Sequence, residues 1–205
     1  MLASSVARNL PRVAQTVKPI TTKSDFAGCR ALDGRHAVLC LGARLGTEVR
    51  ALQERGHLAI GIDLNPGQDN PYVLPGDFHD LVFADGSFAA VYTNALDHLF
   101  DLPRLAAEIQ RVLAPDGVLI ADVAPGFEEG QLPGAFEATA WPKIDELVRA
   151  LGDAGLRLVS RRSLDRAPWQ QLILVPAAAE NAGRRGDAQA VPVRPDDGWT
   201  ARGRP

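Results

Sequence analysis

From residue 36 onward, short apolar runs alternate with segments of helical periodicity, and this alternation constrains the fold more than any other feature. The runs are rich in Val, Ile and Leu, as expected for strands buried on both faces. Strands that alternate with helices build a mostly parallel sheet with helices on its faces. We expect strands over 36–41, 58–64, 73–74, 89–94 and 117–123, and helices over 47–55, 102–113 and about 144–151.

Two further apolar runs, Leu156–Leu164 and Trp169–Val175, close the pattern. Only Asp165–Pro168 separates them, which is too short for a crossover helix, so these strands must be antiparallel. The sequence therefore predicts an α/β fold of three layers around a seven-stranded, mostly parallel sheet whose last strand is antiparallel.

The composition changes at both ends of this pattern. In the N-terminal segment 1–35, residues 1–24 contain four basic residues and no acidic residue, which fits either an amphipathic helix and loop beside the sheet or a transit-peptide-like start. Residues 178–205 are rich in Ala, Arg, Gly, Pro and Asp, with little apolar periodicity, and we expect them to be disordered. The predicted domain is 36–177.

The bulk composition excludes several classes of protein. A net charge of -3 and a pI near 5.8 give no reason to expect nucleic acid or an anionic membrane as the main partner. No apolar stretch approaches the length that spans a bilayer. The two cysteines, Cys29 and Cys40, lack metal-ligand spacing, so we expect no metal, no disulfide scaffold and a cytoplasmic protein.

Three polar or glycine-rich clusters follow the first three predicted strands. The first, 42–48, begins with Gly42 and includes Gly46, which allow a tight strand-to-helix turn and a close backbone approach. Such turns are also common for purely structural reasons. Because the carboxyl ends of parallel strands meet at one edge, the three clusters are expected to lie together there.

The second cluster ends the second strand with Asp63, 21 positions after Gly42, where a carboxylate can accept hydrogen bonds from a ribose diol. Asp63 could instead cap the turn before Pro66. In the third cluster, Asp77 can accept from an adenine amino group while Phe78 packs on the ring. A turn-forming role for Asp77 is the alternative.

With these motifs in order, residues 36 to about 176 resemble a class I S-adenosylmethionine-dependent methyltransferase, and GIDLNPG and the stretch from GDFHD to GVLI follow that family closely. The resemblance implies a Rossmann-like methyltransferase fold with S-adenosyl-L-methionine as cofactor. It also implies four groups of cofactor-binding residues: Gly42, Ala43, Arg44 and Gly46 at the methionine end, Asp63 and Leu64 at the ribose, Asp77 and Phe78 at the adenine, and Asn94, Ala95 and Leu96 near the reactive end.

Two positions depart from the pattern of that family. Cys40 stands where the family usually has an acid, and Arg44 where it usually has a glycine. Arg44 could pair with the carboxylate of the cofactor, pair with an acidic substrate, or fill the pocket or point to solvent. Because of these departures, a non-catalytic methyltransferase-like binding or regulatory protein remains an alternative. A nicotinamide-dependent dehydrogenase fits less well, because Arg44 and Thr47 replace two of its three fingerprint glycines.

Methyl transfer from a sulfonium is a displacement that depends chiefly on positioning, and a general base is needed only for a protonated oxygen or nitrogen acceptor. Asp97 and His98, just after the fourth strand, are the candidates for that role, with His79 a weaker one. Packing or capping is the alternative for each histidine.

The loop over 125–140 contains Phe127 and Phe136 and is followed by Trp141, which suits a mobile lid over a small acceptor. A small-molecule acceptor, either a small metabolite or a sugar-linked compound, is the first expectation, and a protein or peptide acceptor is the second. The sequence leaves the oligomeric state open.

Overall fold

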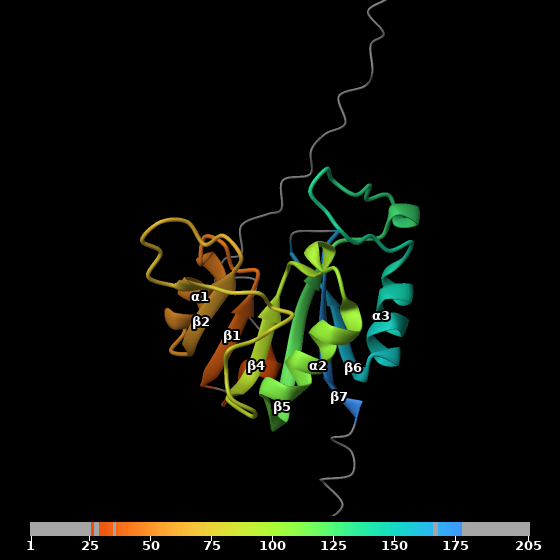
Figure 1. The fold of residues 1–205 in the computed structure, drawn as a ribbon. Coiled ribbons are helices and arrows are strands. Elements are labelled where there is room, and N and C mark those ends of the chain that lie inside the picture. Colours follow the sequence, from red (N-terminus) through yellow and green to blue (C-terminus); the bar gives the residue numbers. More distant parts are fainter. Residues whose placement is uncertain (1–25, 27–28, 35, 166–167, 178–205) are drawn as a thin grey trace, which may run out of the picture.

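The computed structural model describes residues 26, 29–34, 36–165 and 168–177, and its strands form one seven-stranded sheet in the order β3-β2-β1-β4-β5-β7-β6 (Figure 1). The predictions for 1–25 and for the tail 178–205 lie outside these residues. The strands are β1 (Ala37–Leu41), β2 (Leu58–Asp63), β3 (Val73–Pro75), β4 (Phe88–Thr93), β5 (Leu113–Val123), β6 (Leu156–Ser163) and β7 (Gln170–Pro176).

Strand pairing follows the predicted pattern. The first five strands pair in parallel, with Cys40 of β1 opposite Gly61 of β2 on one side and Tyr92 of β4 on the other. β7 lies between β5 and β6 and is antiparallel to both. The seven strands and the antiparallel last strand are therefore confirmed.

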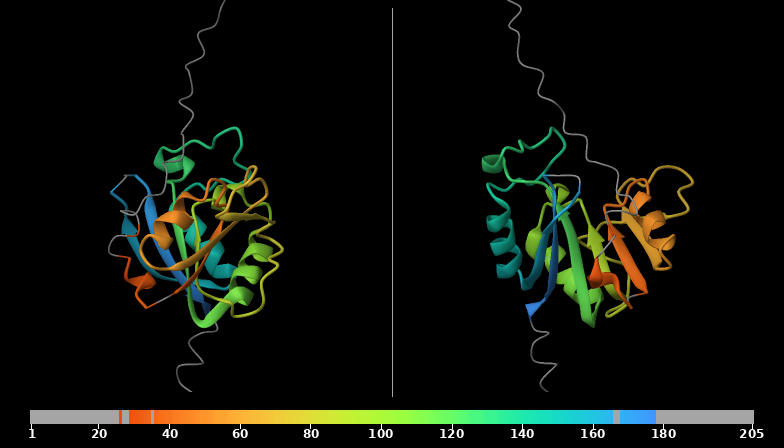
Figure 2. Two further views of the ribbon diagram at one scale, coloured as in Figure 1. Left: turned by 90° about the vertical axis from the view of Figure 1, so that its left-hand side faces the viewer. Right: turned by 180° about the vertical axis from the view of Figure 1, so that it is seen from behind.

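Helices cover both faces of the sheet. α1 (Thr47–Gln53) packs on one face, and α2 (Leu102–Val112) and α3 (Ile144–Asp153) pack on the other, as the views from the side and from behind show (Figure 2). Because side chains alternate along a strand, β1 feeds both apolar layers: Val38 and Cys40 lie in the layer under α1, and Leu39 and Leu41 in the layer under α2 and α3. The three-layer prediction is confirmed.

One predicted break between a helix and a strand is absent. The sequence Pro115–Gly117 was expected to stop α2 and to precede a strand at 117, but β5 begins at Leu113, directly after the helix. The pairing with β4 shifts register there, from Phe88 opposite Leu113 to Ala90 opposite Val118. An irregularity of this kind accommodates extra residues in one strand of a pair, so the turn residues lie within the strand.

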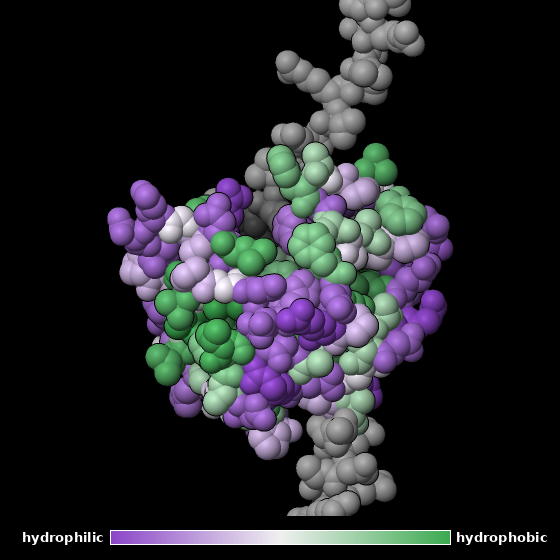
Figure 3. Space-filling model, viewed as in Figure 1, coloured by the Kyte–Doolittle hydropathy of each residue, from purple (hydrophilic) through white to green (hydrophobic). Residues whose placement is uncertain are grey.

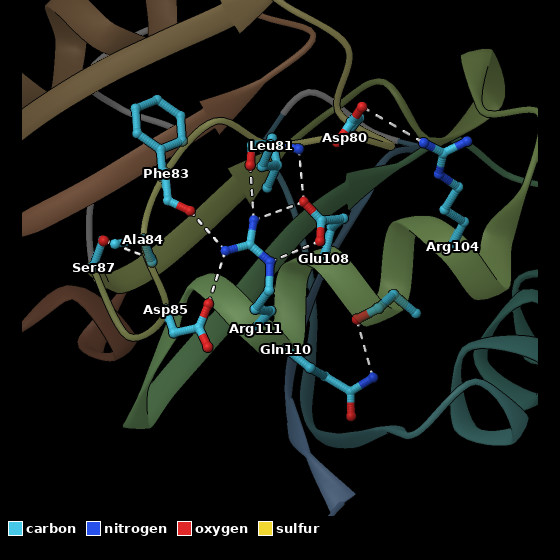
Figure 4. A network of polar contacts seen from close by, with 11 residues as sticks. Asp80, Leu81, Phe83, Ala84, Asp85, Ser87, Arg104, Glu108, Gln110 and Arg111 are labelled. Carbon is cyan, nitrogen blue, oxygen red and sulfur yellow. Dashed lines mark hydrogen bonds and ion pairs between the residues drawn. The ribbon is translucent and has the colours of Figure 1, made fainter.

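Arg111 of α2 holds the chain segment that connects β3 to β4 in place. The Arg111 guanidinium donates to the carbonyl oxygens of Leu81 (2.8 Å) and Phe83 (2.7 Å), to Asp85 (2.9 Å) and to both carboxylate oxygens of Glu108 (2.8 Å each), as Figure 4 shows. The hydrogen bond from Arg111 lowers the pKa of Glu108. Within the described residues no helix occupies this link, so Arg111 fixes its path over the sheet.

No helix in the described ranges combines the length and apolar character needed to cross a membrane. Cys29 and Cys40 are both buried free thiols, in agreement with the prediction that they form no disulfide.

Candidate functional site

The carboxyl ends of β1, β2, β3 and β4 meet at one edge of the sheet, which is the upper edge in Figure 1. The three clusters singled out in the sequence follow β1, β2 and β3, and the predicted Asn94–Ala95 segment follows β4. The structure thus brings the predicted cofactor-binding residues to one edge.

The glycine turn after β1 is tight because protein neighbours lie against it. Gly42 and Gly46 have φ angles of 67° and 71°, in the left-handed region that favours glycine. A methyl group on Gly42 would lie 2.5 Å from Cβ of Ala95, and one on Gly46 would lie 2.7 Å from Cβ of Tyr72. Both glycines are therefore required by packing within the fold, a reason that the sequence alone did not reveal.

Asp63 joins this turn to the end of β2. Its Oδ2 accepts from the backbone N–H of Arg44 at 3.1 Å, and its Oδ1 accepts from the backbone N–H of Asn65 at 2.7 Å. An ionised carboxylate has about four acceptor positions, so each oxygen retains capacity for one more donor. The capping role and the ligand-binding role considered for Asp63 are thus compatible.

Arg44 adopts a φ of 22°, a conformation that is uncommon for a residue other than glycine. The hydrogen bond from its N–H to Asp63 and the one that its carbonyl accepts from the Asn70 side chain, at 2.9 Å, hold the backbone there. The Arg44 side chain is exposed. The exposed side chain points to solvent, and pairing of Arg44 with the carboxylate of the cofactor or with an acidic substrate stays a prediction.

Asn70 is a structural residue of the site that the sequence reasoning missed. Its side-chain amide donates to the carbonyl oxygens of Arg44 and Pro66, each at 2.9 Å, and its oxygen accepts from the N–H of Tyr72 at 3.0 Å. The β2–β3 loop is thereby fixed against the glycine turn. Only the turn-rich composition of 65–70 hinted at such a role.

Glu48 is a second residue that the sequence reasoning missed. It lies in the first turn of α1 with 4% of its surface exposed, and its Oε2 accepts from the Thr47 hydroxyl at 2.8 Å. Burial raises the pKa of Glu48, and the Asp63 carboxylate raises it further. Burial also raises the pKa of the Cys40 thiol well above its usual value, with Glu48 adding to the rise. The buried carboxyl group of Glu48 therefore lies close to position 40, where the side chain is a thiol and offers no carboxylate.

Asp77 is held by its neighbour His79. The backbone N–H and the ring Nδ1 of His79 lie 2.8 Å and 2.9 Å from Oδ1 of Asp77. The hydrogen bond from the backbone N–H of His79 lowers the pKa of Asp77, and the ring contact adds to that effect. Both bonds go to Oδ1, so Oδ2 retains its capacity to accept from a ligand.

The other ring nitrogen of His79 is occupied as well. Nε2 lies 3.3 Å from the backbone N–H groups of both Phe100 and Asp101, and the ring is buried. Nε2 must therefore accept and Nδ1 must carry the proton. The prediction of His79 as a weaker candidate base is wrong, because both of its nitrogens are committed to structure.

The segment after β4 closes the edge beside the glycine turn. The buried Thr93 hydroxyl donates to the carbonyl of Leu41 at 3.2 Å and accepts from the N–H of Ala95 at 3.1 Å, which fixes Ala95 against Gly42. Phe78 is half-buried, and its ring lies beside the same position of Gly42, 3.9 Å from where a Cβ would be. Of the remaining predicted residues, Ala43 and Leu96 are buried, Asn94 is half-buried and Leu64 is 69% exposed.

Asp97 and His98 connect the site to the loop over 125–140, which we call the lid loop. The Asp97 carbonyl accepts from the N–H groups of Ala138 (2.8 Å) and Thr139 (2.9 Å), and His98 Nδ1 lies 3.0 Å from the Phe136 carbonyl. Because a carbonyl only accepts, Nδ1 carries a proton, and in the neutral ring the lone pair is then on Nε2, which lies 4.0 Å from the Asp97 carboxylate. This tautomer is the one that a general base at Nε2 requires.

The lid loop is closed at its base and fastened at its tip. At the base, the N–H groups of Phe127 and Glu128 donate to the carbonyl oxygens of Trp141 and Pro142, each at 3.0 Å. The tip is fastened to 97–99 by the contacts above and by the Thr139 hydroxyl, which donates to the Leu99 carbonyl at 2.7 Å. Apolar residues gather on the outer surface of this loop (Figure 3), where Phe136 is 85% exposed.

The arrangement fits a nucleoside-containing ligand better than a metal. Asp63 and Asp77 present carboxylate oxygens with accepting capacity after β2 and β3, and Phe78 lies between the glycine turn and His79. In the part of the chain that the structure describes, no group of three or more His, Cys, Asp or Glu residues could hold a metal ion.

Comparison with known sequences agrees with this interpretation. Residues 39–121 match the family described as a methyltransferase domain. A curated relative, malonyl-[acyl-carrier protein] O-methyltransferase of Halorhodospira halophila, is 36% identical over 103 residues, which cover 43% of this chain and 35% of the relative. The match thus spans about a third of the length of that relative.

Solved structures with the same fold are similar over most of the chain. One is from the complex between the Haloferax volcanii Trm112 methyltransferase activator and a methyltransferase, with a TM-score of 0.59, 21% identity and coverage of 74% of this chain and 90% of the other. Another is the Burkholderia thailandensis 1,6-didemethyltoxoflavin-N1-methyltransferase with bound S-adenosylhomocysteine, with a TM-score of 0.57, 21% identity and coverage of 71% and 73%. At this identity the likeness shows the shared fold.

Proposed function

We propose that this chain binds S-adenosyl-L-methionine at the carboxyl edge of its sheet and methylates a small molecule, and the match of residues 39–121 to a methyltransferase domain supports this. The observation that carries the proposal is the Asp63 carboxylate, which joins the glycine turn to β2 and keeps one acceptor position on each oxygen. A ribose diol offers two hydroxyl donors to a carboxylate.

The other residues of the edge have complementary roles in this proposal. The exposed Asp77 carboxylate accepts from the adenine amino group, held in place by His79, while Phe78 packs on the base. The segment Asn94–Ala95 borders the reactive end. Glu48, buried close to Cys40, supplies a carboxyl group near the amino end of the cofactor in place of the acid that is missing at position 40.

When bound, the cofactor supplies an electrophilic methyl group on a positively charged sulfur. The contribution of the protein is to align the acceptor atom with that methyl group and to exclude water. Where the acceptor carries a proton, His98 Nε2 or the Asp97 carboxylate takes it, and the bond between His98 Nδ1 and the Phe136 carbonyl fixes the ring for that role.

The acceptor is proposed as a small molecule because the lid loop encloses a confined space beside Asp97. A sugar-linked acceptor, expected from the sequence, stays a prediction. The same holds for a cytoplasmic location.

Calorimetric titration of the full-length protein with S-adenosylmethionine and S-adenosylhomocysteine tests the proposal. We expect both to bind with micromolar dissociation constants. The control is Asp153→Asn, which replaces an exposed acid at the C-terminal end of α3. This variant should bind both compounds as tightly as the wild type. If neither compound binds at millimolar concentration, the methyltransferase proposal fails and the non-catalytic, partner-binding alternative takes its place.

A further inference from the structure

A pocket lies between the lid loop, the ends of β4 and β5, and the residue that precedes β7. It is a partly open hollow with about 390 Å³ of space between its walls and across its mouth. Its walls are made by Asp97, Ala124, Pro125, Gly126, Phe127, Gln131, Pro133, Glu137, Thr139, Ala140, Trp141 and Trp169.

Three of the residues that line the pocket are aromatic. Trp141 and Trp169 are 9% and 6% exposed, so each is held firmly by the protein around it. The indole N–H of Trp141 donates to the Ala124 carbonyl at 3.1 Å, which fixes the ring and satisfies its one donor. Phe127 is 41% exposed at the edge of the lid loop. The pocket therefore offers aromatic surface without a free indole donor at Trp141.

The charged residues of the pocket have one sign. Asp97 and Glu137 are both acidic, and no lysine, arginine or histidine is among the residues that line it. The Asp97 side chain is 13% exposed, and Glu137 accepts from the N–H of Gly134 at 2.8 Å through Oε2. Aromatic rings together with carboxylates attract cations and repel anions.

We propose that this pocket receives the methyl acceptor and selects a compact amine, bound as its ammonium ion with its apolar body against Trp141 and Trp169. This inference rests on the methyltransferase function proposed above and adds the chemical class of the acceptor. Asp97 and Glu137 present their carboxylates to the same pocket, and they pair with the ammonium ion in addition to their contacts with His98 and Gly134.

The transfer then follows from the positions of these groups. The ammonium ion first gives one proton to the Asp97 carboxylate, which frees the nitrogen lone pair. That lone pair forms the new N–C bond as the C–S bond breaks, and the electron pair of the C–S bond stays on sulfur, so that neutral S-adenosylhomocysteine and a methylammonium product result. The proton on Asp97 leaves to solvent or to His98 Nε2, 4.0 Å away.

Three isosteric probes test the charge preference: phenethylamine, 2-phenylethanol and phenylacetate, which are cationic, neutral and anionic at neutral pH. The third tryptophan of the chain, Trp199, is replaced in a Trp199→Phe background, so that the fluorescence reports on Trp141 and Trp169 alone. Titrations are made with and without saturating S-adenosylhomocysteine. We expect phenethylamine to bind about tenfold or more tightly than 2-phenylethanol, and phenylacetate most weakly.

Variants assign the preference to the pocket. Glu137→Gln keeps an acceptor for Gly134 and removes the charge, and Asp97→Asn removes the second acid. Each should reduce the preference for the amine several-fold, with thermal unfolding showing that the variant is folded. Glu128→Gln is the matched control, because Glu128 lies on the same loop but pairs with Lys143 and does not line the pocket.

The outcomes separate this inference from the methyltransferase proposal. Equal binding of the three probes, a preference for the neutral or anionic one, or no binding of any at millimolar concentration overturns the inference, even if S-adenosylhomocysteine binds. A preference for the amine that Glu137→Gln reduces supports the pocket assignment, and it does so even if S-adenosylhomocysteine fails to bind, in which case only the proposed reaction is lost.

Discussion

The backbone N–H of Arg44 donates a hydrogen bond to the Asp63 carboxylate at 3.1 Å, so the turn after β1 is fastened to the end of β2. The main chain of residue 44 makes this contact, while its side chain is exposed. An arginine can therefore stand where the resemblance expects a glycine without interrupting the link between turn and strand.

The first prediction concerns this link. In Asp63→Asn the carboxylate becomes an amide whose nitrogen cannot accept, so a donor from Arg44, from Asn65 or from the ribose loses its partner. We expect the affinity for S-adenosylhomocysteine to fall by about 1–3 kcal/mol. Calorimetry against Asp153→Asn checks this, and unchanged affinity would remove Asp63 from the proposed site.

A second prediction separates steric contact from backbone strain at a glycine. Gly46 and Gly34 have nearly equal φ angles, 71° and 70°, but only Gly46 has close neighbours at the Cβ position, with Tyr72 Cβ at 2.7 Å. Gly34→Ala should destabilise the fold by about 1 kcal/mol from strain alone. Gly46→Ala should cost at least about 2 kcal/mol more, because Tyr72 must move. Urea unfolding of both variants measures the difference, and equal losses would contradict the close packing.

The third prediction is a dependence of stability on pH through Glu48. Burial raises its pKa in the folded state, so the folded protein holds the proton more tightly than the unfolded chain. The wild type should therefore lose stability as pH rises from the unfolded value, about 4.3, through the raised folded value. Glu48→Gln removes this loss and should become relatively more stable than the wild type as the pH rises above the unfolded value of Glu48. A parallel pH dependence of the urea midpoint in both proteins would show that Glu48 does not titrate with a raised pKa.

The fourth prediction concerns the link from β3 to β4. Arg111→Lys keeps the positive charge but cannot contact two carbonyls and two carboxylates at once, and we expect a loss of about 2 kcal/mol in stability. Arg104→Lys, on the same helix, is the control: Arg104 is exposed and lies 3.8 Å from the exposed Asp80, so its replacement should have little effect. Chemical denaturation measures both, and equal stabilities would show that Arg111 does not fix the link.

The apolar runs predicted the strands well because burial on both faces demands such runs wherever a parallel strand crosses the core. The start of β5 was misplaced because the register shift opposite Phe88 depends on pairing between strands, which turn residues such as Pro115 do not encode locally. The candidate edge residues followed from the rule that parallel strands end together.

The partners of those residues could not be predicted in the same way. His79 meets Phe100 and Asp101 across about twenty residues of chain, and only the fold brings them into contact. Glu48 follows Thr47 in the first turn of a helix, where an acid is usually a solvent-exposed partner of the helix dipole. Its burial is set by how α1 lies on the sheet, a tertiary property.

The double closure of the lid loop bears on how fast a ligand can come and go. Its base bonds join backbone groups beside Gly126, whose position is so confined that a Cβ would overlap the Pro142 carbonyl. The tip bonds, at Asp97, His98 and Leu99, are separate from the bonds of that base. If a ligand enters by release of the tip while the base stays closed, the turnover of such an enzyme would be set by the lifetime of a few tip contacts, and its selectivity by the residues that line the pocket behind them.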